Sequence, residues 1–258
     1  MAIFVGAGCA SPSAAVKSAR VERSKVSYGP ERSQFGELHV VPGRSSYPVV
    51  VLIHGGFWGA RYGLDLMSPL ADDLAGRGYA VWNIEYRRVG ERGGGWPGTL
   101  DDTVAALDRL TTLSQEKGFV IENTAVVGHS AGGQLALWLA GRPKQTVAIR
   151  LAVGLGPVTN LALAASADLG GGAVQSFLGG TPSEVPDRYR VAMPGLPASG
   201  TRSVAIVGAR DDVVPSEFST GFETITIDRA DHFDLIDPHH AAWSAVVTLL
   251  EESKTTSP

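Results

Sequence analysis

The sequence predicts an α/β fold in which a mostly parallel central sheet carries helices on both faces and a small cap or lid insertion. Three observations lead to this prediction. From Lys25 onward, short aliphatic runs alternate with longer stretches of helical spacing, no internal repeat is visible, and several short runs are apolar at every position. Strands of a parallel sheet show such unbroken apolar runs because helices bury both of their faces.

The expected strands are of two kinds. Continuous aliphatic runs, typical of buried parallel strands, occupy residues 49–53, 80–84, 125–127, 151–153 and 204–207. Two further segments alternate between apolar and polar residues, and they are predicted to be an early antiparallel strand at 35–41 and the last strand at 222–227.

Helical spacing marks the segments 64–77, 99–117 and 131–140. In the second of these, apolar residues recur at steps of three and four, namely at Leu100, Val104, Leu107, Leu110 and Leu113. Pro97 fits near the start of this helix and Gly118 near its end. Asp237 and Pro238 are the expected N-cap and first residue of a closing helix that runs to about Leu250.

The predicted organisation is one domain over residues 25–252, with a disordered or signal-like segment at 1–24 and a frayed tail at 253–258. Within the domain, residues 159–201 are rich in Ala, Gly and Pro and contain no clear strand. A stretch of this length inside a compact domain is usually functional. We expect a partly helical cap or lid over the mouth of the sheet, with a plain surface loop as the alternative.

Composition excludes several classes of protein. With 22 Lys plus Arg against 26 Asp plus Glu, the formal net charge of −4 lacks the basic excess of a nucleic-acid-binding surface. No apolar run reaches the roughly 18 residues expected of a transmembrane helix. The single cysteine, Cys9, cannot form an intrachain disulfide or a thiolate zinc site. A small molecule, rather than a nucleic acid or a membrane, is the expected partner.

Residues 1–10 are small and apolar and contain the sequence Gly-Ala-Gly before Cys9. They resemble the end of a bacterial lipoprotein signal, in which such a cysteine is acylated. However, no basic segment precedes them and the apolar run is short for a secretory signal. As written, the sequence predicts a cytoplasmic protein. The alternative is an exported lipoprotein anchored at Cys9, whose true start would lie upstream.

Residues 128–132 read Gly-His-Ser-Ala-Gly and have the form G-x-S-x-G. The expected strand 125–127 enters this sequence and the expected helix 131–140 leaves it, which is the arrangement of a nucleophile elbow. Ser130 would then lie at a helix N-terminus, where the dipole and free N–H groups stabilise a developing anion. Ser130 is the candidate nucleophile, and a glycine-flanked turn with a capping serine is the alternative.

A serine nucleophile needs a base, which is itself oriented by an acid. The histidines that follow Ser130 in the chain are His232, His239 and His240. His232 comes just after the last expected strand, so it falls in a loop at the carboxyl edge of the sheet and is the candidate base. His239 and His240 fall in the first turn of the closing helix, and adjacent positions on a helix do not face one metal ion.

The acid is either Asp211 or Asp212, because both follow the expected strand 204–207. The G-x-S-x-G turn, a later Gly-x-x-Asp-x-x-Val-Pro sequence and a histidine after the last strand together resemble the α/β-hydrolase family. The resemblance covers roughly residues 33–250. It implies the α/β-hydrolase fold and places the acid at Asp211, three residues after the glycine, with Asp212 as the alternative.

Residues 54–58 read His-Gly-Gly-Phe-Trp. They resemble the oxyanion loop of kynurenine formamidases and related small esterases. Backbone N–H groups in such a loop stabilise the negative charge of a tetrahedral intermediate, and the resemblance implies donors at Gly56 or Phe57 and at Ala131. His54 is expected to hold this loop in place, and neither a metal nor an organic cofactor is expected.

Residues 85–88 and 93–97 resemble the strand-to-loop segment that lines the site in the same group. Trp58 and Trp96 fall in loops at the predicted carboxyl edge of the sheet, where open α/β sheets bind ligands. We expect both tryptophans to form walls of a substrate pocket for an aryl or planar acyl group. The alternative is that they only pack the loops.

These predictions describe a serine hydrolase of the carboxylesterase or arylformamidase type. His232, held by Asp211, would deprotonate Ser130, which would attack an ester or formamide carbonyl and form an acyl-enzyme. Ester and formamide cleavage use the same triad, so both stay open. The alternatives are a short-peptide or acyl-aminoacyl hydrolase and a non-catalytic ligand-binding protein with a hydrolase-like fold.

Overall fold

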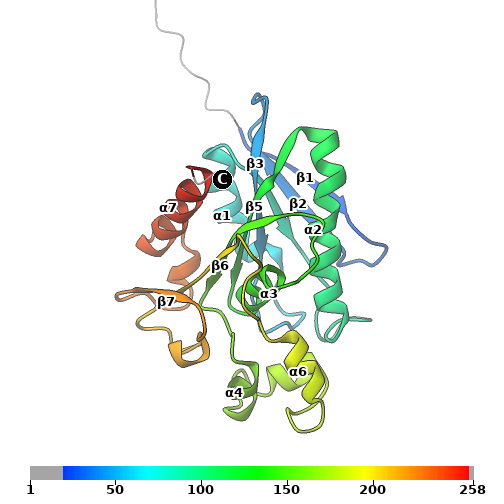
Figure 1. Cartoon of the computed structure of the whole chain (residues 1–258), viewed down its shortest axis with the longest axis vertical. Coiled ribbons are helices and arrows are strands. Elements are labelled where there is room, and N and C mark those ends of the chain that lie inside the picture. The colour runs from blue at the N-terminus through cyan, green and yellow to red at the C-terminus, as the bar shows by residue number, and fades with distance from the viewer. Residues whose placement is uncertain (1–19, 256–258) are drawn as a thin grey trace, which may run out of the picture.

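An eight-stranded sheet with the order β1-β2-β4-β3-β5-β6-β7-β8 forms the centre of the molecule (Figure 1). The computed structural model describes residues 20–255. The strands are β1 (Glu22–Ser27), β2 (Phe35–Val40), β3 (Tyr47–Ile53), β4 (Ala80–Ile84), β5 (Phe119–His129), β6 (Ile149–Leu155), β7 (Arg202–Gly208) and β8 (Glu223–Ile227). β2 is antiparallel to both of its neighbours, whereas all other neighbouring strands are parallel.

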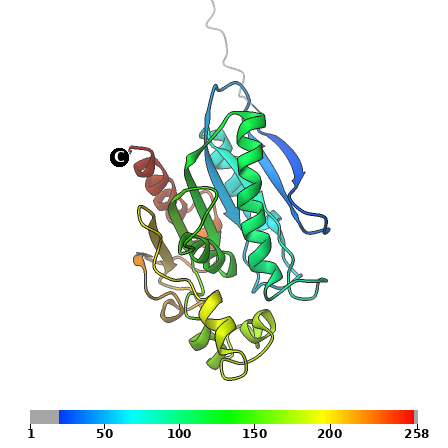
Figure 2. The same ribbon diagram turned by 45° about the vertical axis from the view of Figure 1, so that its right-hand side comes forward.

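Helices cover both faces of this sheet, and the predicted α/β-hydrolase fold is confirmed. The helices that pack on it are α1 (Ser68–Gly76), α2 (Gly98–Lys117), α3 (Ala131–Ala140) and α7 (Ala241–Thr255). One hydrophobic core lies under α1 and α7 and the other under α2 and α3, so that α7 and α2 stand on opposite sides of the strands (Figures 1 and 2).

Strand β3 shows why an unbroken apolar run is needed. Its alternate residues Val49 and Val51 belong to the core under α2 and α3, whereas Val50 and Leu52 belong to the core under α1 and α7. Successive side chains of a strand point to opposite faces. Because both faces are covered, a polar residue at any of these positions would lose its contact with water.

Three short helices lie between β6 and β7: α4 (Leu161–Ser166), α5 (Ala173–Leu178) and α6 (Pro186–Ala192). We call residues 159–201, which contain them, the helical insertion. In Figure 1 α4 and α6 lie below the sheet, beyond the carboxyl end of β6. Shorter 3₁₀ turns are η1 (Leu64–Met67), η2 (Ser216–Phe218) and η3 (Asp234–Ile236). Among the described residues, none of the helices combines the length and the hydropathy of a membrane span.

The closing helix α7 begins at Ala241, and not at Pro238 as the sequence predicts. The carboxylate of Asp237 accepts the N–H of His239 at 2.9 Å, which closes a local turn before the helix. Asp and Asn side chains often form such turns instead of capping a helix. His239 and His240 therefore precede α7 and do not lie in its first turn.

Strand β1 falls partly within residues 1–24, which the sequence predicts to be disordered or signal-like, and this corrects the prediction for Glu22 to Ser24. It begins at Glu22, and its first four residues are exposed. No apolar alternation marks it in the sequence, because it is held by backbone pairing with β2 at the edge of the sheet. The possible lipoprotein cysteine, Cys9, lies outside the described residues.

Candidate active site

Ser130 lies in the sharp turn between β5 and α3. Its φ of 55° and ψ of −120° are a conformation that a residue with a side chain rarely adopts. The turn depends on two glycines, since a Cβ at Gly128 would lie 2.0 Å from the carbonyl oxygen of Gly132, and one at Gly132 would lie 2.2 Å from that of Ile53. The N–H of Ser130 donates to the carbonyl of Leu155 at 2.7 Å, which ties the turn to β6.

Asp211 and His232 form a buried pair. Asp211 Oδ2 lies 2.7 Å from His232 Nδ1, and its other oxygen accepts the backbone N–H groups of Val213 and Val214 at 3.0 and 2.7 Å. A carboxylate only accepts hydrogen bonds, so Nδ1 carries the proton and Nε2 is left free to act as a base. Asp212 is exposed, and the geometry therefore favours Asp211 as the acid.

Ser130 and His232 line one cavity of about 220 Å³. The rest of its wall consists of Gly56, Phe57, Tyr62, Leu66, His129, Val213 and Phe233. Within residues 20–255, no Asp, Glu, Lys or Arg belongs to this lining. The site thus combines a candidate nucleophile and a candidate base with an apolar, aromatic wall.

The candidate oxyanion loop, residues 54–58, packs directly on the turn that holds Ser130. A Cβ at Gly55 would lie 2.9 Å from the Cβ of Ser130. Gly56, Phe57 and Trp58 all have positive φ values, of 110°, 52° and 56°. Gly56 and Phe57 reach the cavity beside Ser130.

Ala131, the third candidate donor, is the first residue of α3. The first N–H groups of a helix have no acceptor within the helix. The three candidate N–H groups thus belong to the two segments that flank Ser130, which is the arrangement that an oxyanion hole needs.

His54 connects the oxyanion loop to the end of β4. Its Nε2 lies 2.7 Å from Glu85 Oε1, and its ring stacks on Tyr86 with centroids 4.3 Å apart. The hydroxyl of Tyr86 donates to the carbonyl of His54 at 3.0 Å. This is the structural role that the sequence suggests for His54. Within residues 20–255, no three His, Cys, Asp or Glu side chains gather where they could hold a metal ion.

His129 is a residue of the site that the sequence did not single out. It is buried, and its Nε2 lies 3.0 Å from the carbonyl oxygen of His232, to which it donates because a carbonyl can only accept. The two rings are 4.5 Å apart. Burial, and then electrostatic repulsion from the neighbouring His232 imidazole when both rings are protonated, lower the pKa of His129 to about 3. Only its place beside Ser130 in the motif could have pointed to it.

The expected aromatic walls, Trp58 and Trp96, are not part of this cavity, which corrects the prediction. Trp58 is completely buried and stacks on Phe177, so its indole lies inside the protein. Trp96 lines a separate groove of about 400 Å³ together with Trp138. The aromatic walls near Ser130 are instead Phe57, Tyr62 and Phe233. Of these, Phe57 lies in the oxyanion motif and Phe233 follows His232, but no pattern marks Tyr62.

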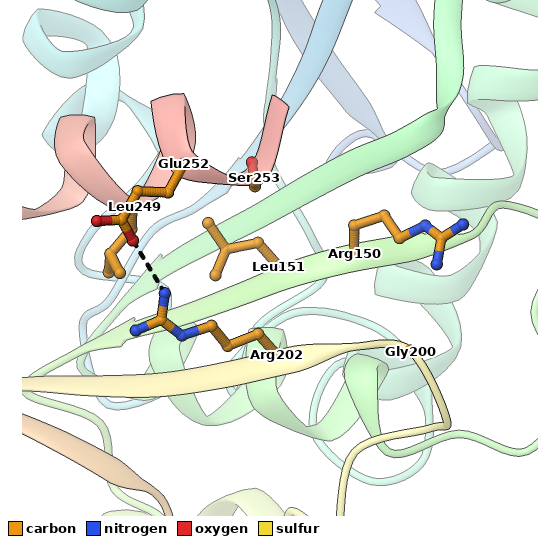
Figure 3. A pocket seen from close by; sticks show the side chains of 7 residues that line it. All are labelled: Arg150, Leu151, Gly200, Arg202, Leu249, Glu252 and Ser253. Atoms are coloured by element: carbon orange, nitrogen blue, oxygen red, sulfur yellow. Dashed lines mark hydrogen bonds and ion pairs between the residues drawn. The ribbon is translucent and has the colours of Figure 1, made fainter. Parts of the chain in front are cut away.

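Another groove, of about 460 Å³, lies at the opposite edge of the sheet, where β6 and β7 begin and α7 ends (Figure 3). There Arg202 bonds to Glu223 at 2.6 Å and to Glu252 at 3.1 Å. Arg150 extends away from Glu252 (Figure 3). None of the candidate catalytic residues lies at this edge.

The fold and the site together define an α/β hydrolase. The chain belongs to the BD-FAE family, because that family model matches residues 40–225. It is also 37% identical to the carboxylesterase NlhH of Mycobacterium tuberculosis over 98 residues, which make up 38% of this chain and 30% of that relative. The match thus spans less than a third of the length of the curated relative.

Solved esterase structures share the fold. Esterase B of Lactobacillus rhamnosis superposes with a TM-score of 0.75 at 20% identity, covering 92% of this chain and 86% of that one. A truncated carbohydrate esterase from gut microbiota gives 0.76 at 16% identity, with 93% and 99% covered. A bacterial heroin esterase gives 0.71 at 19% identity, with 93% and 86% covered. The kinship to kynurenine formamidases stays a prediction.

Proposed function

We propose that this chain is a serine hydrolase that cleaves carboxylic esters through an acyl-enzyme. One observation carries the proposal: Ser130, in a strained turn at the start of α3, shares a cavity with His232, and the Nδ1 atom of His232 lies 2.7 Å from Asp211 Oδ2. The carboxylesterase NlhH and the esterases of the same fold support this assignment.

In this mechanism His232 Nε2 takes the proton of Ser130 Oγ while that oxygen attacks the ester carbonyl. The N–H of Ala131 and that of Gly56 or Phe57 receive the oxygen on which negative charge develops. The protonated His232 gives its proton to the leaving alcohol, and water then repeats the sequence on the acyl-enzyme. Asp211 keeps the imidazole in its working tautomer and stabilises its charged form.

The cavity wall favours uncharged substrates. It offers aromatic and aliphatic surface from Phe57, Tyr62, Leu66 and Phe233, and its volume of about 220 Å³ suits a short acyl chain or a flat ring. N-formylkynurenine carries both an ammonium and a carboxylate group. A charge that enters an apolar site without a partner is costly, so we place esters before aryl formamides. Aryl formamides are the second candidate because of the His-Gly-Gly-Phe-Trp motif.

The first experiment compares kcat/KM for p-nitrophenyl acetate, butyrate and octanoate with that for N-formylkynurenine. We expect the best ester to exceed the formamide at least tenfold, or about 1.4 kcal/mol of transition-state preference. The reverse order would make the protein an arylformamidase. If neither class is hydrolysed and a fluorophosphonate does not label the protein, a ligand-binding role would replace the enzyme.

The assignment of the triad is tested with matched pairs of variants. Ser130→Ala should abolish labelling and lower kcat by several orders of magnitude, because no other nucleophile replaces it. Asp211→Asn should lower kcat by about 10⁴-fold, as expected when the histidine loses its orienting acid. His232→Asn should lower kcat by orders of magnitude, because the base is lost. The exposed neighbour variant Asp212→Asn, paired with Asp211→Asn, and the loop variant His239→Asn, paired with His232→Asn, should keep the wild-type kcat. Equal losses in both members of a pair would refute the assignment.

A further inference from the structure

We propose that Gln134, Trp58 and Phe177 form a clamp that positions the oxyanion loop, and that the helical insertion acts on catalysis through this clamp. The inference rests on the proposed esterase function. None of the three side chains belongs to the lining of the cavity at Ser130, so they are positioning residues.

Gln134 joins three parts of the molecule. Its backbone N–H donates to the carbonyl of Ser130, the residue that precedes α3, at 3.1 Å. Its side-chain oxygen accepts the indole N–H of Trp58 at 3.0 Å, and its side-chain nitrogen donates to the carbonyl of Ala192 at 2.8 Å. A single buried amide thus connects the nucleophile helix, the oxyanion loop and the last residue of α6.

Both hydrogen bonds of this amide are shielded from water, since Gln134 and Trp58 are each 0% exposed. A buried donor that loses its partner cannot turn to water instead, so such a pair fixes the geometry of both side chains. The indole of Trp58 is therefore held at a defined distance from the helix that carries Ser130.

The helical insertion holds the other side of the loop. The ring of Phe177, on α5, stacks on Trp58 with centroids 4.6 Å apart and planes inclined by 5°. Gly170, between α4 and α5, lies so near the ring of Phe57 that a Cβ there would be 2.8 Å from it. Within residues 20–255, no residue of the insertion lines the cavity at Ser130, so these contacts are its route to the reaction.

The oxyanion loop needs such support because of its backbone. Phe57 and Trp58 have φ values of 52° and 56°, in the left-handed region that favours glycine. Residues with side chains keep this conformation only where their surroundings impose it. A change at Trp58 would rotate the peptide group between Phe57 and Trp58. Through the backbone of Phe57 this rotation would displace the preceding peptide group, whose N–H, that of Phe57, is a candidate oxyanion donor.

The test removes the clamp without touching the cavity. Trp58→Phe keeps an aromatic ring on Phe177 but deletes the indole N–H, and Gln134→Met keeps the length of the side chain but deletes both hydrogen bonds. We expect each variant to lower kcat for p-nitrophenyl butyrate by about 10- to 100-fold, as for a misplaced catalytic group, with a KM close to wild type. The double variant should lose no more than the worse single variant, because both substitutions break the same bond.

Two readouts separate positioning from general damage. The first is the affinity for a trifluoromethyl ketone, whose carbonyl carbon is attacked by the serine oxygen so that its carbonyl oxygen becomes an oxyanion; this affinity should fall by the same factor as kcat. The second is the pH profile of kcat, which should keep its shape because His232 is unchanged. Rates are counted per active site titrated with a fluorophosphonate. The matched control is Trp82→Phe in β4, which deletes an equally buried indole N–H that donates to Ala106 and should leave kcat per site unchanged.

Phe177 provides an independent arm if the other variants fold poorly. Phe177→Leu should lower kcat, whereas Phe177→Tyr, which keeps the stacked ring, should retain the wild-type kcat. If Trp58→Phe, Gln134→Met and Phe177→Leu keep the wild-type kcat per site and ketone affinity, the clamp is refuted while the esterase function stands. If the wild-type protein itself neither hydrolyses the ester nor reacts with the fluorophosphonate, the proposed function fails instead.

Discussion

His129 and His232 are neighbouring imidazoles with different tasks. His232 is held by a carboxylate and reaches the cavity through its second nitrogen. His129 is held by a carbonyl, so its proton stays on Nε2 and its Nδ1 has no hydrogen-bond partner among the described residues. Burial lowers the pKa of His129 to about 3. It therefore remains neutral while it fixes the backbone of the candidate base.

This lowered pKa predicts a loss of stability in acid. With its pKa lowered to about 3, His129 of the folded protein resists protonation until pH falls to about 3, whereas the unfolded chain takes up the proton near the ordinary imidazole pKa of 6.5. Stability from the neutral ring is thus complete above pH 6.5 and declines as pH falls, by about 1.4 kcal/mol per pH unit. Urea unfolding of wild type and His129→Gln between pH 7.5 and 4.5 measures this.

The difference in unfolding free energy between wild type and His129→Gln should shrink as the pH is lowered, because only the wild type carries this acid-sensitive term. His239→Gln, which removes an exposed histidine, provides the control and should differ from wild type by a constant amount. A constant difference for His129→Gln as well would contradict a buried, neutral His129.

Among the elements, the turn from β5 into α3 is the most tightly packed part of the site. The sequence predicts it well, since G-x-S-x-G combines a local requirement for small residues with the strand and helix around it. The close approach of Gly132 to the carbonyl of Ile53, 79 positions earlier by residue number (132 − 53), depends on β3 and β5 being neighbours in the sheet. The glycines therefore serve the packing of three elements and not only the turn.

Gly132→Ala should be strongly destabilising, because its Cβ would lie 2.2 Å from one backbone oxygen and 2.3 Å from another, neither of which can move aside freely. We expect a loss of about 3 kcal/mol or more, in the range of substitutions that break tight packing. The matched control is Gly76→Ala at the end of α1, where nothing lies within 4 Å of a new Cβ. There, better helix propensity should raise stability by up to about 1 kcal/mol.

Urea unfolding of both alanine variants makes the comparison, and similar effects of the two substitutions would show that the elbow is less closely packed than described.

The contrast between buried and exposed positions also explains which elements the sequence predicts. β3 and β4 are visible as apolar runs because side-chain burial holds them. β1 is not, because backbone pairing at an exposed edge leaves its residues polar. The sequence places the start of α7 too early, at Pro238, because Asp237 forms a turn and does not cap the helix.

At the scale of the whole molecule, the sequence identifies the chemistry of the site better than its walls. The candidates Ser130 and His232 follow from residue type, chain order and the strand before each of them, whereas Asp211 is preferred to Asp212 in the sequence only through the family resemblance. The link between Trp58 and Gln134 joins positions 76 residues apart, and the contact of Phe177 with the oxyanion loop depends on how the insertion folds back. Such contacts arise from packing between distant segments and have no local sequence pattern.

Asp102 shows how distant segments are locked together outside the site. It is 1% exposed and accepts hydrogen bonds from Gln34 at 2.7 Å, from the backbone of Arg87 at 2.8 Å and from the guanidinium of Arg87 at 2.6 Å. Through these bonds one carboxylate on α2 holds the loop before β2 and the segment after β4. The two joined segments adjoin β2 and β4, which are neighbours in the sheet.

Asp102→Asn should therefore lower the free energy of unfolding by about 3–5 kcal/mol, because the new amide turns a donor toward Arg87 and leaves that cation without its charge partner. The control is Asp187→Asn, which breaks the exposed pair between Asp187 and Arg190 and should cost less than about 1 kcal/mol. Urea unfolding at low and high salt distinguishes them further, since salt screens only the exposed pair effectively. Equal losses, or a strong salt dependence for Asp102→Asn, would mean that the buried network contributes no more than a surface ion pair.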